Sequence, residues 1–319
     1  MKVTVSWIAG AVAVSAVALS AIALSASQAP AAQSPAAPPP AAPPVSQAAP
    51  PTQAARPLRV YIHAGLKTHA EGQHDYPQFL ADWSKLLQNR GAIVDGGLHF
   101  PSARELAGVD VMVIYKGDAG YLGVEDRAAL DSFLRRGGGI VTIHDALCGP
   151  EPDQYANIVG GGKKHGEVNY TLEADVPYTI VDAAHPIMQG MSNFSIKDEA
   201  FFNMTWSKTP EIKVLATATM AATPSAKGHE GEVVPQMWTY EKSLAPAPTG
   251  MPYRAFVWMQ GHNYSNFALP NVQSMLLRAV AWAGKRPIDA LMTVRPARGG
   301  GRGTNPAAPG AEGRGRGGQ

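Results

Sequence analysis

The hydrophobic pattern of the first half of the chain alternates between short apolar runs and amphipathic segments. Residues 58–64, 109–117 and 139–146 are apolar and rich in β-branched side chains, which predicts buried strands, and residues 92–97 predict a weaker strand. Between these runs, residues 76–91 and 124–139 carry apolar side chains at helical spacing, and the second segment places acids in its first turn and arginines in its last. This alternation predicts parallel strands joined by crossover helices, as in an open α/β sheet.

The second half of the chain has a different pattern. Six short runs, NYTLEA, YTIVD, FSIKDEAFF, KVLATATM, PQMWTYE and RAFVWMQ, alternate in polarity and follow one another without clear helices. They predict extra strands, partly antiparallel, that extend or cover the sheet. An amphipathic helix over residues 272–284 closes the domain. The fold class predicted is therefore α/β, mainly parallel, with antiparallel strands added in the second half.

The start of the chain is typical of an export signal. Residues 1–29 combine Lys2, an apolar run from Ile8 to Leu24 and small residues after it. The alternative is an uncleaved anchor helix, because the run approaches the length that spans a bilayer. We favour a cleaved signal peptide, since Ala and Ser make the run only mildly apolar. Both interpretations predict a periplasmic or secreted protein, attached to a membrane only if the segment is uncleaved.

Two further segments do not have the composition of a packed core. Residues 30–57 are rich in Pro and Ala and predict a semi-extended linker. Residues 292–319 are rich in Arg and Gly and predict a disordered tail. Arginines in such a tail can bind nucleic acid, but no aromatic side chain is interleaved with them, so a solvated tail is favoured. One domain remains, residues 58–291, which is long enough to bury a sizeable core.

Charge and cysteine content narrow the function classes. The net charge of +2 indicates no strongly charged partner, and we expect no nucleic-acid partner. Cys148 is the only cysteine, which excludes an internal disulfide. It lies four residues after the predicted strand end at His144, not on the strand-to-helix elbow where amidotransferases of this architecture place their nucleophile, so we expect a small buried residue. The glycines of residues 137–140 end a helix and enter a strand, the reverse of a phosphate loop, so no nucleotide is expected.

The polar residues that follow predicted strands are the candidates for chemistry, because open α/β sheets bind ligands beyond the carboxyl ends of their strands. Histidines and acids gather at these positions: His63, His69, His74, Asp75, His144, Asp145, His165, Asp198, Glu199 and His262. Imidazoles with a carboxylate ligate divalent metals or act as acid and base on a polyol. Each of these residues can instead have a structural role without chemistry. His262 fits a Gly-His-Asn turn, and the Asp198–Glu199 pair fits a solvated strand end.

The stretch GLKTHAEGQHDY, residues 65–76, follows the first predicted strand and carries two histidines. His69 and His74 are five residues apart, so on a helix they would point about 140° away from each other. Metal binding by both therefore requires a loop, which Gly72 permits. We expect one histidine to enter the site and the other to cap the loop, and we favour His74 because Asp75 beside it could orient it.

Taken in order, the motifs THAEGQHDY, RRGGGIVTIHDA, VGGGKKHGEV, HPIMQGMSNFSIKDEAFF and FVWMQGHNYSNFALPNVQSMLLRAVAWA give the chain a resemblance to the ThuA-like, trehalose-utilisation family. The resemblance covers residues 58–284. It implies a flavodoxin-like, three-layer fold of the class I glutamine amidotransferase type, without the amidotransferase nucleophile. It also implies that His144, Glu199 and His262 lie together, and a role in carbohydrate metabolism on a keto-sugar or glycoside.

Three functions follow as hypotheses. The first is an exported sugar-processing enzyme with a small carbohydrate substrate and acid/base chemistry, assisted by a divalent metal such as zinc. Its catalytic residues would be His144, Glu199, His262 and His74, its substrate-binding residues His69, Asp145, His165 and Asp198, and its metal ligands His144, His262 and Glu199. The alternatives are a non-catalytic glycan-binding module and a metal-dependent hydrolase of another substrate. The oligomeric state stays open.

Overall fold

The computed structural model describes residues 56–164, 166, 170–171, 174–209, 212–244 and 252–295, and all of them belong to one compact unit of the chain. The predicted signal peptide, nearly all of the predicted linker, most of the predicted tail and His165 lie outside these residues. None of the described helices has the length and apolar character required to span a bilayer.

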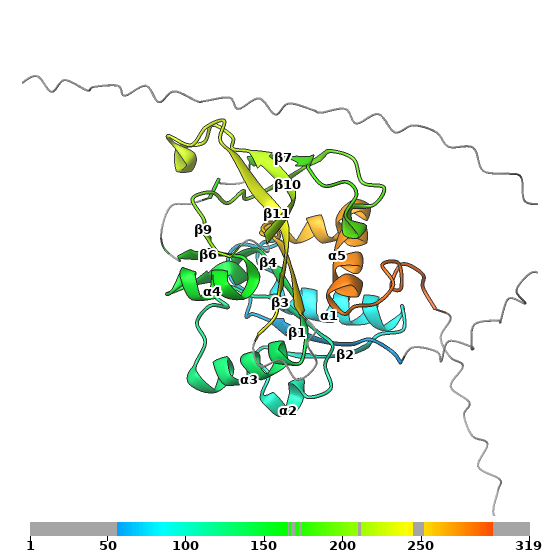
Figure 1. The fold of residues 1–319 in the computed structure, drawn as a ribbon. Helices are drawn as coiled ribbons and strands as arrows, with labels where there is room; N and C mark the ends of the chain where they lie inside the picture. The colour runs from blue at the N-terminus through cyan, green and yellow to red at the C-terminus, as the bar shows by residue number, and fades with distance from the viewer. Residues whose placement is uncertain are drawn as a thin grey trace, which may run out of the picture. The chain divides into compact units, whose positions relative to one another are not determined.

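A large sheet forms the centre of the described domain (Figure 1). Its spatial order is β2 (Ile93–Gly97), β1 (Arg59–Ala64), β3 (Val111–Tyr115), β4 (Gly139–Ile143), β12 (Tyr253–Trp258), β11 (Val233–Lys242), β10 (Ile212–Thr219), β7 (Ala174–Ile180) and β8 (Phe194–Asp198). Neighbours from β2 to β12 pair in parallel. Every pair from β12 to β8 is antiparallel. The predicted change from a parallel first half to added antiparallel strands is confirmed.

Helices cover both faces of the parallel half of the sheet. On one face lie α1 (Tyr76–Gln88) and α5 (Pro270–Ala283), and on the other lie α2 (Ala103–Leu106), α3 (Val124–Arg135) and α4 (Pro152–Val159). Because side chains alternate along a strand, β1 feeds both cores: Val60 and Ile62 pack with Phe79 of α1, whereas Tyr61 joins Phe133 of α3 in the second core. The chain therefore has the predicted three-layer fold, with two hydrophobic cores on either side of one sheet.

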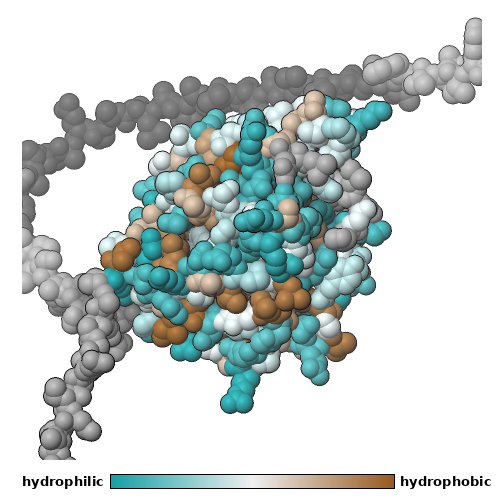
Figure 2. Space-filling view, turned by 180° about the vertical axis from the view of Figure 1, so that it is seen from behind, coloured by the Kyte–Doolittle hydropathy of each residue, from teal (hydrophilic) through white to brown (hydrophobic). Residues whose placement is uncertain are grey.

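Several short elements were not predicted. They are the helices α2 and α4 and a small sheet of β5 (Cys148–Gly149), β6 (Gly161–Lys164) and β9 (Thr205–Trp206). Segments of two to eight residues show too little periodicity to be read from sequence. The strand predicted over 139–146 ends at Ile143, because residues His144–Leu147 turn into a 3₁₀ helix. The surface seen from behind in Figure 2 carries its hydrophobic residues in small separate groups among hydrophilic ones.

Candidate functional site

The candidate site lies where four strands end on the same edge of the sheet. Strands β1, β4 and β12 are parallel, so their carboxyl ends meet at one edge. Four antiparallel pairings separate β12 from β8, and because this number is even, β8 runs in the same direction as β12. Polar residues directly after these strands are therefore brought together by the topology, although up to about two hundred positions separate them in the sequence.

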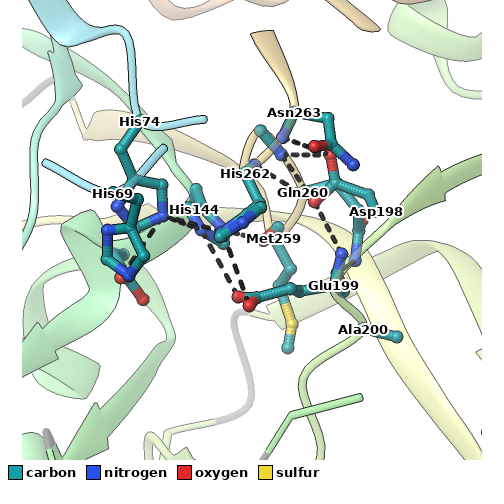
Figure 3. A network of polar contacts seen from close by, with 12 residues as sticks. His69, His74, His144, Asp198, Glu199, Ala200, Met259, Gln260, His262 and Asn263 are labelled. Carbon is teal, nitrogen blue, oxygen red and sulfur yellow. Dashed lines mark hydrogen bonds and ion pairs between the residues drawn. The ribbon is translucent and has the colours of Figure 1, made fainter. Parts of the chain in front are cut away.

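Three buried histidines converge at this edge (Figure 3). Nε2 of His74 lies 2.9 Å from Nε2 of His144 and 3.0 Å from Nδ1 of His262. One ring nitrogen from each of the three lies within 4.8 Å of the other two, a spacing compatible with a metal site. Together with Glu199, these residues are called the histidine–glutamate cluster below.

The ring orientations are set by partners outside the three histidines. Nδ1 of His144 lies 3.0 Å from the carbonyl oxygen of Met259, and a carbonyl only accepts, so this nitrogen donates and the neutral ring has its lone pair on Nε2. Nδ1 of His74 lies 3.0 Å from Oγ1 of Thr68. Metal-binding histidines commonly have such a partner on the ring nitrogen that faces away from the ion. The donor set therefore fits a divalent ion such as zinc.

Backbone bonds join the loop after β1 to the loop after β12. The amide of His74 donates to the carbonyl of His262 at 2.9 Å, and Gln73 forms an isolated antiparallel bridge with Asn263. The amide of Tyr264 donates to the carbonyl of Gly72 at 2.8 Å. These bonds hold two segments that are distant in the sequence against each other. They therefore keep the His74 and His262 side chains side by side.

The backbone is strained at the same place. Six described non-glycine residues have a positive φ, and three of them are His69 (62°), His74 (47°) and His144 (56°). Each such residue costs on the order of 1–3 kcal/mol and persists only where the surrounding structure enforces it, most often at functional sites. His144 stands at the sharp turn directly after β4, where a 3₁₀ helix begins. A positive φ at three neighbouring histidines makes this region a candidate functional site.

Glu199 is the carboxylate of the cluster. Its Oε2 lies 3.7 Å from Nε2 of His144 and its Oε1 lies 3.4 Å from Nδ1 of His262. The residue is 7% exposed, and its pKa is raised to about 7: burial is the largest cause, the charge of Asp145 also raises the pKa, and the charges of His144 and Lys163 oppose the shift. A buried carboxyl with a pKa near neutrality can exchange a proton at physiological pH, which suits general acid–base chemistry.

Asp198 has no exposed surface and many donors. It accepts from the backbone amides of Gly261, His262 and Asn263 at 3.1–3.2 Å, from the amide of Glu199 at 2.8 Å, and from the Asn266 side chain at 2.7 Å. Burial raises its pKa, opposed by the charge of His144 and by the amides of Glu199 and Asn263. These contacts favour a role for Asp198 in holding the turn that presents His262.

Asp145 connects the cluster to a buried lysine. Its Oδ2 lies 3.9 Å from Nε2 of His74, and its Oδ1 lies 3.4 Å from Nζ of Lys163. Lys163 is 6% exposed, and its ammonium lies 3.7 Å from the ring centroid of Phe201, which stacks on His144. Burial acts to lower the pKa of Lys163, but the negative charge of Asp145 beside it outweighs this effect and raises the pKa. A fixed positive charge therefore lies beside the cluster.

The burial of Lys163 was not predicted, because two adjacent lysines are usually exposed. The glycines that precede Lys163 could have indicated it, since they allow the backbone to pack closely. A Cβ at Gly162 would lie 2.4 Å from the carbonyl oxygen of Pro152, so only glycine lets β6 pack this closely against α4. This close packing carries Lys163 into the interior.

The remaining predicted residues lie at the margin of the cluster or outside the described part. His69 is exposed, with its ring centroid 4.0 Å from that of His74 and 5.4 Å from that of His262. His165 falls outside the described residues. Cys148 is buried, with Sγ 3.3 Å from Oδ1 of Asp145, and burial raises the pKa of its thiol well above the usual value. A thiol held protonated in this way is a poor nucleophile.

Burial also determines the charge of two cluster histidines. The pKa of His74 is lowered to about 2 and that of His262 to about 4, in both cases mainly by burial and next by the charge of His144. Both imidazoles are therefore neutral near pH 7, the state in which a ring nitrogen can bind a metal ion or accept a proton.

The family model and two solved structures that match this chain point to the same family. Residues 67–283 match the family model ThuA, described as trehalose utilisation. A ThuA-like protein from Bacteroides uniformis has a TM-score of 0.54 at 16% identity, covering 77% of this chain and 100% of that one. A ThuA-like protein from Parabacteroides merdae has a TM-score of 0.53 at 19% identity, covering 72% and 90%. At these identities the likeness shows the fold.

A GMP synthase protein from Thermoplasma acidophilum is similar at a TM-score of 0.42 and 9% identity, covering 72% of this chain and 96% of that one. No curated protein sequence matches the chain.

Proposed function

The chain belongs to the ThuA family, and from this we propose that it acts on a keto-sugar or keto-glycoside by acid–base chemistry at the histidine–glutamate cluster. The observation that carries the proposal is the position of Glu199, a buried carboxyl with a pKa of about 7 that lies within 3.7 Å of two imidazoles. The sequence of residues 1–29 and 30–57 supports an exported protein, so we place this chemistry outside the cytoplasm.

The chemistry follows from the acidity of a sugar C–H next to a carbonyl. Glu199 as carboxylate takes this proton, and the electron pair of the broken C–H bond moves onto the carbonyl oxygen. Return of the proton to the opposite face of the same carbon gives epimerisation. Return of the proton to the former carbonyl carbon, with transfer of the α-hydroxyl proton to the former carbonyl oxygen, gives isomerisation, and departure of a substituent on the β carbon with its bonding electron pair gives elimination. Lys163 supplies a buried positive charge beside the region where negative charge develops.

Nε2 of His74, Nε2 of His144 and Nδ1 of His262 are the atoms that would hold a divalent ion. When bound, such an ion polarises the substrate carbonyl and stabilises the developing negative charge. Met259 and Thr68 hold the His144 and His74 rings in the required orientation, and Asp198 holds the turn of His262. We assign Glu199 the role of base in this arrangement and leave the ligand positions to the histidines.

The test is deuterium exchange by the full chain. With a keto-glycoside in D₂O, we expect NMR to show loss of the proton on the carbon next to the carbonyl. Glu199→Gln should slow this exchange by about 10²–10⁴-fold, the usual contribution of a general base. Glu125→Gln, on the outer surface of α3, is the matched control and should exchange at the wild-type rate.

Other outcomes separate the competing functions. Exchange that persists in Glu199→Gln would show that another group is the base. Sugar binding without exchange of any keto-glycoside by the wild type would favour a glycan-binding module. Ester or amide hydrolysis that depends on the cluster would favour a metal-dependent hydrolase.

A further inference from the structure

A pocket rich in arginine lies at the opposite end of the sheet from the histidine–glutamate cluster. Its cavity of about 320 Å³ is lined by residues that precede β1, link α1 to β2 and follow α5: Arg56, Pro57, Leu58, Arg90, Gly91, Arg286, Pro287, Ala290, Leu291 and Arg295. These positions adjoin the amino ends of β1 and β2, whereas the cluster adjoins the carboxyl ends. In Figure 1 the blue start and the orange end of the described chain reach this region beyond α1. We call it the arginine pocket.

The positive charge of the arginine pocket is only partly balanced. Arg56 forms two bonds of 2.8 and 2.5 Å to the carboxylate of Asp110, and Nη2 of Arg286 lies 3.5 Å from the same group. Within the described residues, no other carboxylate pairs with any of the four arginines, and Arg90 and Arg295 form no ion pair. Four guanidinium groups thus face one carboxylate, which leaves a local excess of three positive charges.

Two of these guanidinium groups also have unused donors. Nε of Arg90 and Nε of Arg286 are buried and have no hydrogen-bond partner. Nη1 of Arg90 donates to the carbonyl of Leu86 at 3.1 Å and so caps the end of α1. Nε of Arg90 takes no part in this cap. Buried donors without partners are costly, and the contacts of Arg90 and Arg286 within the described residues do not offset this cost.

The backbone makes room for the fourth arginine. Gly91 has a φ of +88°, and a Cβ there would lie 2.6 Å from Cδ and Nε of Arg295. The amide of Arg295 donates to the carbonyl of Asn89 at 2.8 Å, which fixes the segment against the end of α1. Arg295 is therefore packed in place over a glycine and is part of the wall of the pocket.

The two ends of the sequence are poor in acidic residues. Residues 1–55 contain no Asp or Glu, and residues 296–319 contain Glu312 against Arg298, Arg302, Arg314 and Arg316. Within the described residues, Asp110 is the carboxylate that pairs with the pocket arginines, which leaves their excess positive charge available to an anionic ligand.

We propose that the arginine pocket binds a phosphate group that carries two negative charges. Guanidinium forks match the oxygens of phosphate in paired hydrogen bonds, and several of them around one cavity favour a dianion over a single carboxylate. Leu58, Pro287 and Leu291 line the remainder of the cavity and accommodate an apolar portion of the ligand. Two sources carry this chemistry: a soluble phosphate monoester, or the phosphomonoester headgroup of phosphatidic acid in a membrane.

The experiment measures binding of pyrophosphate to the full chain by isothermal titration calorimetry at low salt. Sedimentation with vesicles that contain phosphatidic acid, compared with phosphatidylcholine vesicles, forms the second arm. We expect Arg90→Gln/Arg295→Gln to bind at least tenfold more weakly in the arm where the wild type binds. Arg135→Gln, on the surface of α3 and paired with Asp131, is the matched control and should bind like the wild type.

The two arms distinguish the sources of phosphate. Pyrophosphate binding that the double variant loses supports a soluble ligand, and vesicle binding without pyrophosphate binding supports a lipid headgroup. Absence of binding in both arms, or equal binding by wild type and double variant, overturns the proposal. If the double variant fails to fold, Arg90→Lys/Arg295→Lys retains the charges but not the planar forks, and affinity within twofold of wild type would overturn it.

Discussion

His144 combines full burial with a left-handed backbone, two features that a histidine in a purely structural role does not need. Its ring is fixed on one side by the Met259 carbonyl and on one face by Phe201, so its remaining nitrogen points in one direction only, toward His74. The turn that carries His262 is held through Asp198, which accepts from the His262 amide. Single residues in this site are therefore positioned before any ligand arrives, which is what acid–base and metal chemistry require.

The first prediction at this scale concerns Asp198. In the wild type, the Asp198 carboxylate accepts hydrogen bonds from several backbone amides. Asn at this position would turn an NH₂ group, itself a donor, toward some of these amides. We expect Asp198→Asn to lower the free energy of unfolding by about 2–4 kcal/mol in urea denaturation, because buried donors lose their acceptor. Asp95→Asn, on the exposed edge strand β2, is the control and should change stability by less than about 0.5 kcal/mol. Equal stability of the two variants would contradict the positioning role.

The second prediction concerns His63, buried in β1. Its pKa is lowered to about 4, mainly by burial and also by the charges of Lys116 and His99, while a hydrogen bond to the backbone of Gly97 and the charge of Asp126 oppose this shift. The unfolded chain takes up this proton near pH 6.5 and the folded chain only near pH 4, so folded stability is complete above pH 6.5 and decreases as the pH falls through this window. The expected loss is about 3 kcal/mol between pH 6.5 and pH 4.

Urea unfolding of wild type and His63→Gln across this pH range checks the prediction. The difference between the two proteins should shrink on acidification, because only the wild type loses the contribution of His63. Two curves that stay parallel from pH 7 to pH 4 would show that His63 does not titrate as described.

At the scale of elements, the site depends on how closely β4 packs against α5. It also depends on the direction of β8, which ends at the same edge of the sheet as β12. A Cβ on Gly139, the first residue of β4, would lie 2.4 Å from the carbonyl oxygen of Ala283 at the end of α5. Backbone atoms on both sides cannot move aside as a side chain would. The absence of a side chain at this position therefore sets the spacing between strand and helix.

Gly139→Ala should accordingly destabilise the domain by about 1–3 kcal/mol through overpacking. Gly117→Ala is the control, since its Cβ would lie 3.6 Å from the Tyr76 hydroxyl, an ordinary contact. Thermal unfolding of both variants measures the effect. An unchanged midpoint temperature of unfolding in Gly139→Ala would mean that α5 can shift away from β4 without loss of folding free energy.

Elements with a clear period were predictable, and those decided by distant packing were not. The apolar run before His144 and the helical spacing of Phe79 and Trp83 gave β4 and α1, and with them the edge where the candidate residues meet. The role of Asp198 was not readable, because its backbone donors lie 63–65 positions later in the chain. Lys163 was likewise missed, because the close packing of β6 against α4 that buries it depends on a contact between Gly162 and Pro152, ten positions earlier. The arginine pocket unites residues from both ends of the domain, which no local pattern reveals.

At the scale of the whole domain, the sheet separates two charged regions. The carboxyl ends of the strands carry the histidine–glutamate cluster, and the amino ends adjoin the arginine pocket. Because the two regions share no residue, changes in one should leave the other intact, and their functions can be tested independently. The central claim concerns the first region: the three histidines form a divalent metal site and Glu199 acts beside it.

The most direct test of that claim is the zinc content of the full chain after equilibrium dialysis, measured by mass spectrometry of the element. We predict one ion per chain for the wild type and for His99→Gln, an exposed histidine outside the cluster, and less than a tenth of this for His74→Gln, His144→Gln and His262→Gln. Glu199→Gln should retain the ion while losing the deuterium exchange. A wild-type protein that holds no more zinc than the three histidine variants would contradict the account.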